Sequence, residues 1–134
     1  MTMTPNIFVY GTLLSSAEHP KGSRLRREAR LIGEATLQGQ LYSLGRYPGL
    51  IETDDPTYLV HGEVYALNSP AGSLVWLDAY EGISPDSEGN DYERCERKAR
   101  LTSGRELTVW VYLYRPSVQG LPVVPDGRWT SRKG

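Results

Sequence analysis

Ile7-Phe8-Val9-Tyr10-Gly11-Thr12-Leu13-Leu14 is the stretch around which the rest of the chain is organised. Its apolar start predicts a short buried strand, and the pattern then becomes polar. A glycine lets a ligand approach the main chain closely, and amide N–H groups that leave a strand end can bind an anion or a developing oxyanion. One interpretation is therefore a main-chain binding pocket formed by the loop Tyr10, Gly11, Thr12 and Leu13. The other is an ordinary strand-to-helix turn, which is the simpler explanation unless the chain also supplies a reactive group.

Four longer segments alternate between apolar and polar residues, as half-buried strands do. They span residues 33–44, 58–67, 92–101 and 106–114. In the last of them every second residue is Leu or Val, and the residues between are mostly aromatic, which is typical of a strand. With the opening strand the chain has five or more short strands. We expect an α+β fold whose sheet is strongly curved, or a small β-barrel, so that it closes its own edges.

Two helices are expected among these strands. Ser23 is a suitable N-cap for a short helix that continues to about Arg30 and carries arginines on a solvated face. Ser69 and Pro70 suit the N-cap and the first helical position of the second helix. This second helix runs to Glu81, and the next residue, a glycine, is a natural stop.

The remaining segments predict loops and a single domain. Residues 15–23 and 84–90 are polar, and the sequence Pro48-Gly49 favours a type II turn. From residue 116 to 134 Pro and Gly predominate, so we expect an irregular tail that Trp129 holds against the body. We expect one domain over residues 1–134, with its core at about 7–115.

Composition excludes several classes of function. A net charge of −1 gives no general affinity for nucleic acid or an anionic membrane. No apolar run approaches the roughly 20 residues of a membrane helix. The single cysteine, Cys95, excludes an internal disulfide, and with only two histidines a zinc site has little support. The N-terminal residues lack a signal-peptide core, so the expected location is the cytoplasm.

Glu81 is the candidate reactive group. Leu74, Leu77 and Glu81 are spaced to share one stripe of the second helix, so the carboxyl sits at the edge of a buried face. It also lies at the helix C-terminus, where the macrodipole disfavours a negative charge. Both effects raise a carboxyl pKa toward neutrality, which suits a general base. The alternative is a frayed helix end with Glu81 in water.

Other groups compete with Glu81 for a chemical role. Glu63 lies in a predicted strand and could point into a barrel or into solvent, and Asp78 is one turn before Glu81. Glu93, Glu96 and Glu106 belong to strands with charge on both sides and indicate solvated faces. Cys95 is better explained as a small packed residue than as a nucleophile. The sequence shows no Ser/His/Asp or Cys/His set and no Walker motif.

Two stretches together resemble the γ-glutamylcyclotransferase-like family, which includes γ-glutamylamine cyclotransferases and AIG2-like proteins. They are Val9-Tyr10-Gly11-Thr12-Leu13 and, about seventy residues later, Leu77-Asp78-Ala79-Tyr80-Glu81-Gly82. Further matches are Tyr47-Pro48-Gly49, Val60-His61-Gly62-Glu63-Val64-Tyr65, Tyr92-Glu93-Arg94 and Val109-Trp110-Val111-Tyr112. The resemblance covers residues 7 to about 115 in the family's order.

The resemblance implies a small mixed β-barrel with flanking helices and an intramolecular reaction. The α-amino group of a γ-glutamyl compound attacks its own γ-carbonyl, which releases the amine and forms 5-oxoproline. In that scheme Glu81 is the general acid/base and the loop Tyr10 to Leu13 holds the substrate. Neither metal nor cofactor is needed, because nucleophile and electrophile belong to one molecule. The implied partner is a small γ-glutamyl compound.

Several points stay open at this level. Pro48, Gly49, Tyr92 and Tyr112 are possible lining residues of the pocket, although tyrosines are numerous enough for simple packing. The tail Val124-Pro125-Asp126-Gly127-Arg128-Trp129 only loosely matches the family's ending. Two other functions use the same site: a non-catalytic small-molecule-binding module, and removal of a γ-glutamyl protecting group in a biosynthetic pathway.

Overall fold

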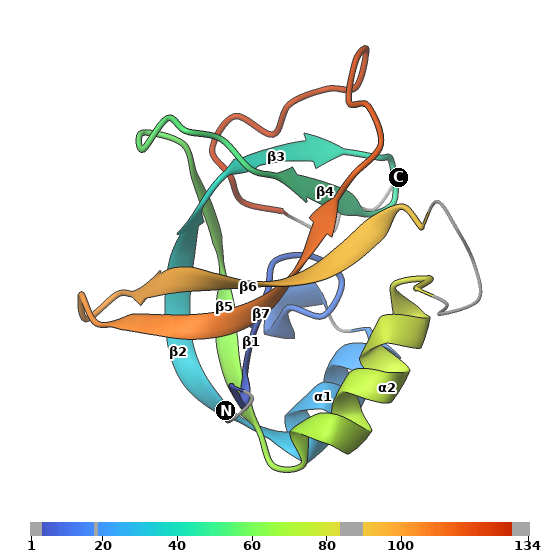
Figure 1. Cartoon of the computed structure of the whole chain (residues 1–134), viewed down its shortest axis with the longest axis vertical. Helices are drawn as coiled ribbons and strands as arrows, with labels where there is room; N and C mark the ends of the chain where they lie inside the picture. The colour runs from blue at the N-terminus through green and yellow to red at the C-terminus, as the bar shows by residue number, and fades with distance from the viewer. Residues whose placement is uncertain (1–3, 18, 84–89, 130–134) are drawn as a thin grey trace.

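The computed structural model describes residues 4–17, 19–83 and 90–129 and has seven strands, two α-helices and a short 3-10 turn (Figure 1). The strands are β1 (Asn6–Val9), β2 (Ala29–Gln38), β3 (Gln40–Ser43), β4 (Pro48–Ile51), β5 (Leu59–Leu67), β6 (Tyr92–Leu101) and β7 (Glu106–Tyr114). The helices are α1 (Pro20–Glu28) and α2 (Pro70–Tyr80), and the 3-10 turn η1 spans Ser15–Ala17. The expected α+β class is confirmed.

Five strands close into a barrel in the order β1-β5-β2-β6-β7. The pair of β1 and β7 is parallel, at Ile7 and Trp110, and all other neighbours are antiparallel. The barrel is therefore mixed, as expected. Closure matters because every strand of the ring has a neighbouring strand on both sides, although β1 pairs with β7 at one position and β2 pairs with β6 at two.

Alternate residues of the strands belong to two different hydrophobic clusters. In β1, Phe8 belongs to a cluster with Val64, Val109 and Val111, whereas its neighbour Ile7 belongs to the other cluster with Leu25 of α1 and Leu77 of α2. This is the period-2 pattern of a sheet with one face inside the barrel and one face under the helices. Figure 1 shows α1 and α2 together on one side of the barrel.

The expected type II turn at Pro48-Gly49 is wrong. These two residues begin β4, in which Pro48 pairs with Ser43 and Gly49 pairs with Tyr42 in a small separate sheet with β3. The chain reverses at residues 44–47 instead, closed by a hydrogen bond from the Leu44 N–H to the Tyr47 carbonyl. Proline is tolerated here because it is the first residue of a short strand in a two-stranded sheet.

The first helix begins earlier than expected and the second where expected. His19, not Ser23, caps α1, because its Nδ1 accepts a hydrogen bond from the Lys21 N–H at 3.0 Å. Ser69 does stand at the N-cap of α2, but its side chain makes no capping hydrogen bond. Gly82 has φ +78°, the left-handed conformation that favours glycine after a helix end.

The C-terminal tail lies against the body without forming a further strand of the barrel, as expected. Trp129 packs against the cluster inside the barrel, which confirms its anchoring role, and Val123 forms an isolated bridge to Tyr42. The Gly127 carbonyl accepts a hydrogen bond from the His61 N–H at 2.8 Å. Residues 130–134, like most of the expected polar loop 84–90, lie outside the described part of the chain. None of the described helices is long and apolar enough to cross a membrane.

Candidate active site

The loop after β1 presents a row of main-chain amides. It is a turn closed by a hydrogen bond of 3.0 Å from the Leu14 N–H to the Gly11 carbonyl. Among the described residues, the N–H groups of Gly11, Thr12 and Leu13 have no hydrogen-bond acceptor. Main-chain N–H groups without an acceptor are able to bind a carboxylate or an oxyanion.

Gly11 is required by a close approach, not by a special backbone conformation. A Cβ at this position would lie 2.9 Å from the Cγ and Cδ atoms of Pro48. The start of β4 therefore presses directly on the loop, and any side chain at position 11 would push the two apart. Pro48 is thus part of the same structural unit as the loop, although it is far from it in sequence.

Glu81 caps the C-terminus of α2 and is held at the edge of a buried helix face. Leu74 and Leu77 on the same stripe are fully buried, so the stripe predicted from the spacing is confirmed. The residue is half-buried, and no described group donates a hydrogen bond to its carboxylate. Burial and, secondarily, the negative charge of Asp78 raise the pKa of Glu81 to about 7.

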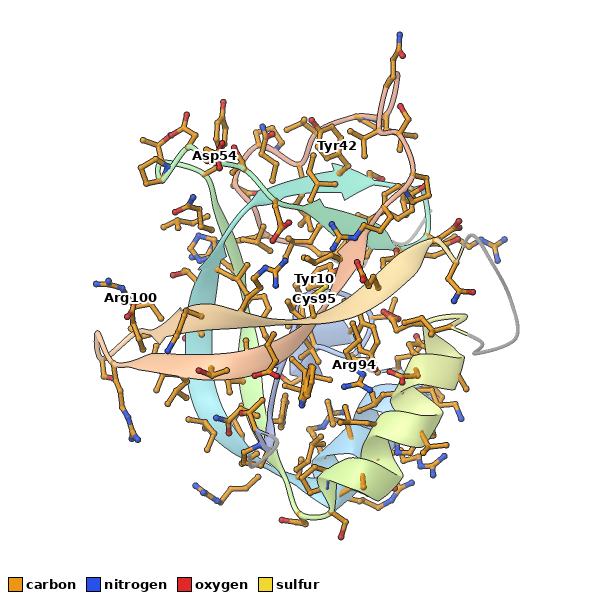
Figure 2. All side chains as sticks on the ribbon, in the orientation of Figure 1. Tyr10, Tyr42, Asp54, Arg94, Cys95 and Arg100 are labelled. Carbon is orange, nitrogen blue, oxygen red and sulfur yellow. The ribbon has the colours of Figure 1, made fainter. Side chains whose placement is uncertain are left out.

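Asp78, one turn earlier on α2, is fixed from two sides. It accepts hydrogen bonds from Arg94 Nε at 2.8 Å and from the Tyr112 hydroxyl at 2.7 Å. Figure 2 shows Arg94 reaching from β6 toward α2, and its guanidinium also lies 4.4 Å from the ring centre of Trp110. Asp78 is therefore a structural carboxylate that ties the helix to β6 and β7, beside but distinct from Glu81.

A cavity of about 610 Å³ brings the two halves of the predicted site together. Its wall contains Phe8, Val9, Tyr10, Gly11, Thr12, Leu13, Tyr47, Pro48, Tyr80, Glu81, Gly82, Asn90, Asp91, Tyr92 and Tyr112. The volume is in the range of small-molecule sites, about 300–1,000 Å³. Gly49 is not on the wall, and a Cβ there would meet the ring of Tyr114 at 2.9 Å. The chemical roles of the wall residues remain predictions.

Tyrosine hydroxyls cross-link the wall. Tyr10 donates to the Tyr112 carbonyl at 2.5 Å, and Tyr92 donates to the Pro48 carbonyl at 2.7 Å. Thr12 and Tyr80 share a hydrogen bond of 2.5 Å between their hydroxyls, which joins the loop to α2. Burial raises the pKa of Tyr10, Tyr92 and Tyr112, so these side chains stay neutral and keep their donor protons. The loop, β4, β7 and α2 are thereby held at fixed spacing.

Sequence reasoning did not assign seven of the wall residues to the site, namely Phe8, Val9, Tyr47, Tyr80, Gly82, Asn90 and Asp91. Two signals were available, because Tyr80 directly precedes Glu81 and Asp91 directly precedes Tyr92. The contribution of Asn90 and Asp91 depends on how β6 returns to the end of α2, which no local pattern predicts.

Among the competing carboxylates, Glu63, Glu93 and Glu106 also have protein partners. Glu63 accepts hydrogen bonds from the Ser15 N–H at 2.9 Å and from the Ser15 hydroxyl at 2.6 Å, and lies on a separate hollow of about 570 Å³. Glu93 pairs with Arg115 at 2.5 Å, and Glu106 pairs with Arg100 at 3.4 Å. Within the described ranges no three His, Cys, Asp or Glu residues are grouped so as to hold a metal ion.

Comparison with known proteins gives consistent matches. A family model described as "Gamma-glutamyl cyclotransferase, AIG2-like" matches residues 7–131. The chain is 34% identical over 128 residues to the "Gamma-glutamylcyclotransferase family protein YtfP" of Escherichia coli K12, covering 94% of this chain and 96% of that protein. It is 33% identical over 113 residues to the "Gamma-L-glutamyl-butirosin B gamma-glutamyl cyclotransferase" of Niallia circulans, covering 82% and 67% respectively. The solution structure of Escherichia coli ytfP superimposes with a TM-score of 0.63 at 31% identity, covering 92% of this chain and 95% of that one.

Proposed function

The chain belongs to the gamma-glutamyl cyclotransferase, AIG2-like family, and from that premise we propose that it cyclises γ-glutamyl amines or γ-glutamyl amino acids to 5-oxoproline. One observation carries the proposal. A carboxyl with a pKa of about 7 and no described hydrogen-bond donor lines the same cavity as Gly11, Thr12 and Leu13, whose main-chain N–H groups have no hydrogen-bond acceptor among the described residues.

The reaction needs one proton carrier. The substrate's α-ammonium must lose a proton before its nitrogen attacks the γ-carbonyl carbon. A free α-amino group has a pKa of about 8, so proton transfer to a carboxylate of pKa about 7 is nearly balanced. Glu81 is therefore assigned the general base. The new C–N bond closes the five-membered ring and leaves the attacking nitrogen with two protons and a positive charge. One of these protons passes through Glu81 to the nitrogen of the old C–N bond as that bond breaks, so the ring nitrogen keeps one proton and the amine leaves neutral. The proton first taken from the α-ammonium passes through solvent to the released amine.

The loop after β1 is assigned two tasks. Its N–H groups hold the substrate in the folded conformer that places the α-nitrogen next to the γ-carbonyl, and they stabilise the negative charge that develops on the carbonyl oxygen. The hydrogen bond between Thr12 and Tyr80 keeps this loop at a fixed distance from the helix end that carries Glu81. No water is consumed, so the site gains from excluding it.

A second candidate is removal of a γ-glutamyl group from a larger amine during biosynthesis. The name of the Niallia circulans relative, a γ-glutamyl-butirosin cyclotransferase, favours this role. The chemistry and the assigned residues are the same, and only the size of the leaving amine differs.

The test is incubation of the protein with a panel of γ-glutamyl compounds, from small amines to amino acids and amino sugars. We expect equal amounts of 5-oxoproline and released amine, and loss of both in Glu81→Gln. Glu106→Gln, a change in an exposed ion pair outside the cavity, is the matched control. Thermal stabilisation by these compounds without any product would instead identify a binding module, and full activity of a folded Glu81→Gln would remove Glu81 from the mechanism.

A further inference from the structure

The cavity has a buried end and an open end. Tyr10, Leu13, Tyr92 and Tyr112 are each less than 9% exposed and form the inner wall with the loop. Tyr47 is 48% exposed, and Asp91 is also exposed, so these two mark the mouth. A glutamyl head at the loop and Glu81 therefore directs its leaving amine toward Tyr47 and Asp91.

The ionisable side chains of opposite signs are unequally represented in the cavity wall, where the described acidic groups have no basic counterpart. Glu81 and Asp91 are the only charged residues in its described lining, which contains no Lys, Arg or His. The closest candidates for compensation are committed elsewhere: Arg94 binds Asp78, and Arg115 binds Glu93. The Asp91 carboxylate forms no ion pair within the described residues, although its main-chain carbonyl accepts a hydrogen bond from the Arg115 N–H at 2.8 Å.

Aromatic rings in the wall also favour a positively charged ligand over a negatively charged one. Tyr10, Tyr47, Tyr80, Tyr92 and Tyr112 all contribute to the wall. The face of an aromatic ring attracts a cation, by about 0.5–1 kcal/mol where the site is exposed to water. At the mouth, a ligand would meet both the Asp91 carboxylate, which repels an anion, and the side chain of Tyr47.

The cavity also has room for more than the glutamyl head. At about 30 Å³ per water molecule, a volume of about 610 Å³ corresponds to roughly twenty waters. A γ-glutamyl group has about nine non-hydrogen atoms, so part of the leaving amine lies inside the walls and within reach of the mouth.

We infer that Asp91 is a specificity-determining residue that favours γ-glutamyl substrates whose leaving amine carries an additional positive charge and disfavours those whose leaving group carries a carboxylate. This inference rests on the proposed cyclotransferase reaction. The substrate class is thus a γ-glutamyl derivative of a diamine, polyamine or amino sugar, in preference to a γ-glutamyl peptide.

Three substrates of matched length test it: the γ-glutamyl derivatives of butylamine, putrescine and γ-aminobutyrate, whose leaving groups end in a methyl, an ammonium and a carboxylate. At low ionic strength we expect kcat/KM to fall in the order putrescine, butylamine, γ-aminobutyrate, by about threefold to fivefold at each step, the scale of an exposed ion pair. Raising the salt concentration to about 1 M should flatten the series, because the Debye length falls to about 3 Å.

Substitutions of Asp91 distinguish its contribution to substrate preference from that of the other wall residues. Asp91→Asn should bring the putrescine and butylamine derivatives to similar kcat/KM, and Asp91→Lys should reverse the order of putrescine and γ-aminobutyrate. Asp54→Asn is the matched control, an exposed aspartate in the loop before β5 that is not part of the cavity wall (Figure 2). Thermal unfolding of each variant reports whether the fold is intact.

The outcomes distinguish the two proposals. Equal kcat/KM for the three compounds in the wild type, or an unchanged preference in a folded Asp91→Asn, overturns the role of Asp91 and leaves cyclotransferase activity standing. If none of the three, and no larger γ-glutamyl amine, releases 5-oxoproline, the proposed function fails and the role of Asp91 fails with it.

Discussion

Two glutamates beside helix α2 have opposite surroundings. Glu28, the last residue of α1, accepts hydrogen bonds from Ser73 Oγ at 2.6 Å, Trp76 Nε1 at 2.8 Å and Arg24 Nε at 3.0 Å. These bonds lower its pKa to about 2. Glu81, at the end of α2, has no described donor, and burial with the charge of Asp78 raises its pKa to about 7.

The difference separates a structural carboxylate from one available for chemistry. The fold supplies Glu28 with three donors, two of them from α2, so that its charge joins the two helices. The fold gives Glu81 a nonpolar helix face, a neighbouring negative charge and an open cavity, but no hydrogen-bond or ion-pair partner in the part of the chain that the structure describes. A group left in that state is positioned to exchange protons with a ligand.

The largest difference between the Glu81→Gln and Glu28→Gln variants should be in catalytic turnover. We expect Glu81→Gln to lower kcat/KM for 5-oxoproline release by about 10²–10⁴-fold, the usual contribution of a general acid/base. Glu28→Gln should leave it within about twofold, because Glu28 does not line the cavity. Comparable losses in two folded variants would mean that the contrast between the sites is not functional.

Glu81→Gln should lower turnover but raise the free energy of unfolding at alkaline pH. The folded pKa of Glu81 is above its ordinary value, so the folded state loses stability as the pH rises from about 4.5 through 7. At pH 8 we expect Glu81→Gln to be more stable than the wild type by about 2 kcal/mol, less than the full shift implies because the cavity admits water. Near pH 4 the two should unfold alike. Urea denaturation at both pH values measures this, and a destabilised variant at pH 8 would show that Glu81 has a stabilising partner.

Glu28→Gln should destabilise the protein. Its folded pKa is depressed, so its contribution is present above about pH 4.5 and lost as the pH falls toward 2. The side chain is 34% exposed, so solvent screening reduces the expected loss to about 1 kcal/mol at pH 7. Urea denaturation of wild type and variant at pH 7 and pH 3 measures it, and a loss of equal size at both pH values would mean that packing, not charge, holds Glu28.

The smallest expected effect is that of Asp78 on Glu81. Asp78→Asn keeps an oxygen that Arg94 and Tyr112 can donate to, but removes the negative charge that raises the Glu81 pKa. The acidic limb of the kcat/KM profile, expected near pH 7 in the wild type, should move to lower pH by roughly half a unit. Glu96→Gln, a change in an exposed carboxylate outside the cavity wall, is the control. A limb that stays in place would leave burial as the sole cause of the raised pKa.

Much of this molecule follows from local sequence. The bounds of β6 and β7, the stop of α2 at Gly82 and the buried stripe that ends at Glu81 could all be read from alternation, helical spacing and a glycine. Strand β4 could not, because Pro48-Gly49 has the local chemistry of a turn and becomes a strand only through pairing with β3. His19 was similarly missed as an N-cap, because histidine seldom has that role.

The sequence by itself determined the alternating strands, the two helices and the presence of one carboxylate on the edge of a buried helix face, since each depends on residues a few positions apart. Only the tertiary structure decided what surrounds that carboxylate. Closure of the barrel sets the loop after β1 against Pro48 and opposite the end of α2, and the return of β6 adds Asp91 at the mouth. These neighbours come from segments far apart in the chain, and a pKa or a charge preference depends on neighbours in space, not on neighbours in sequence.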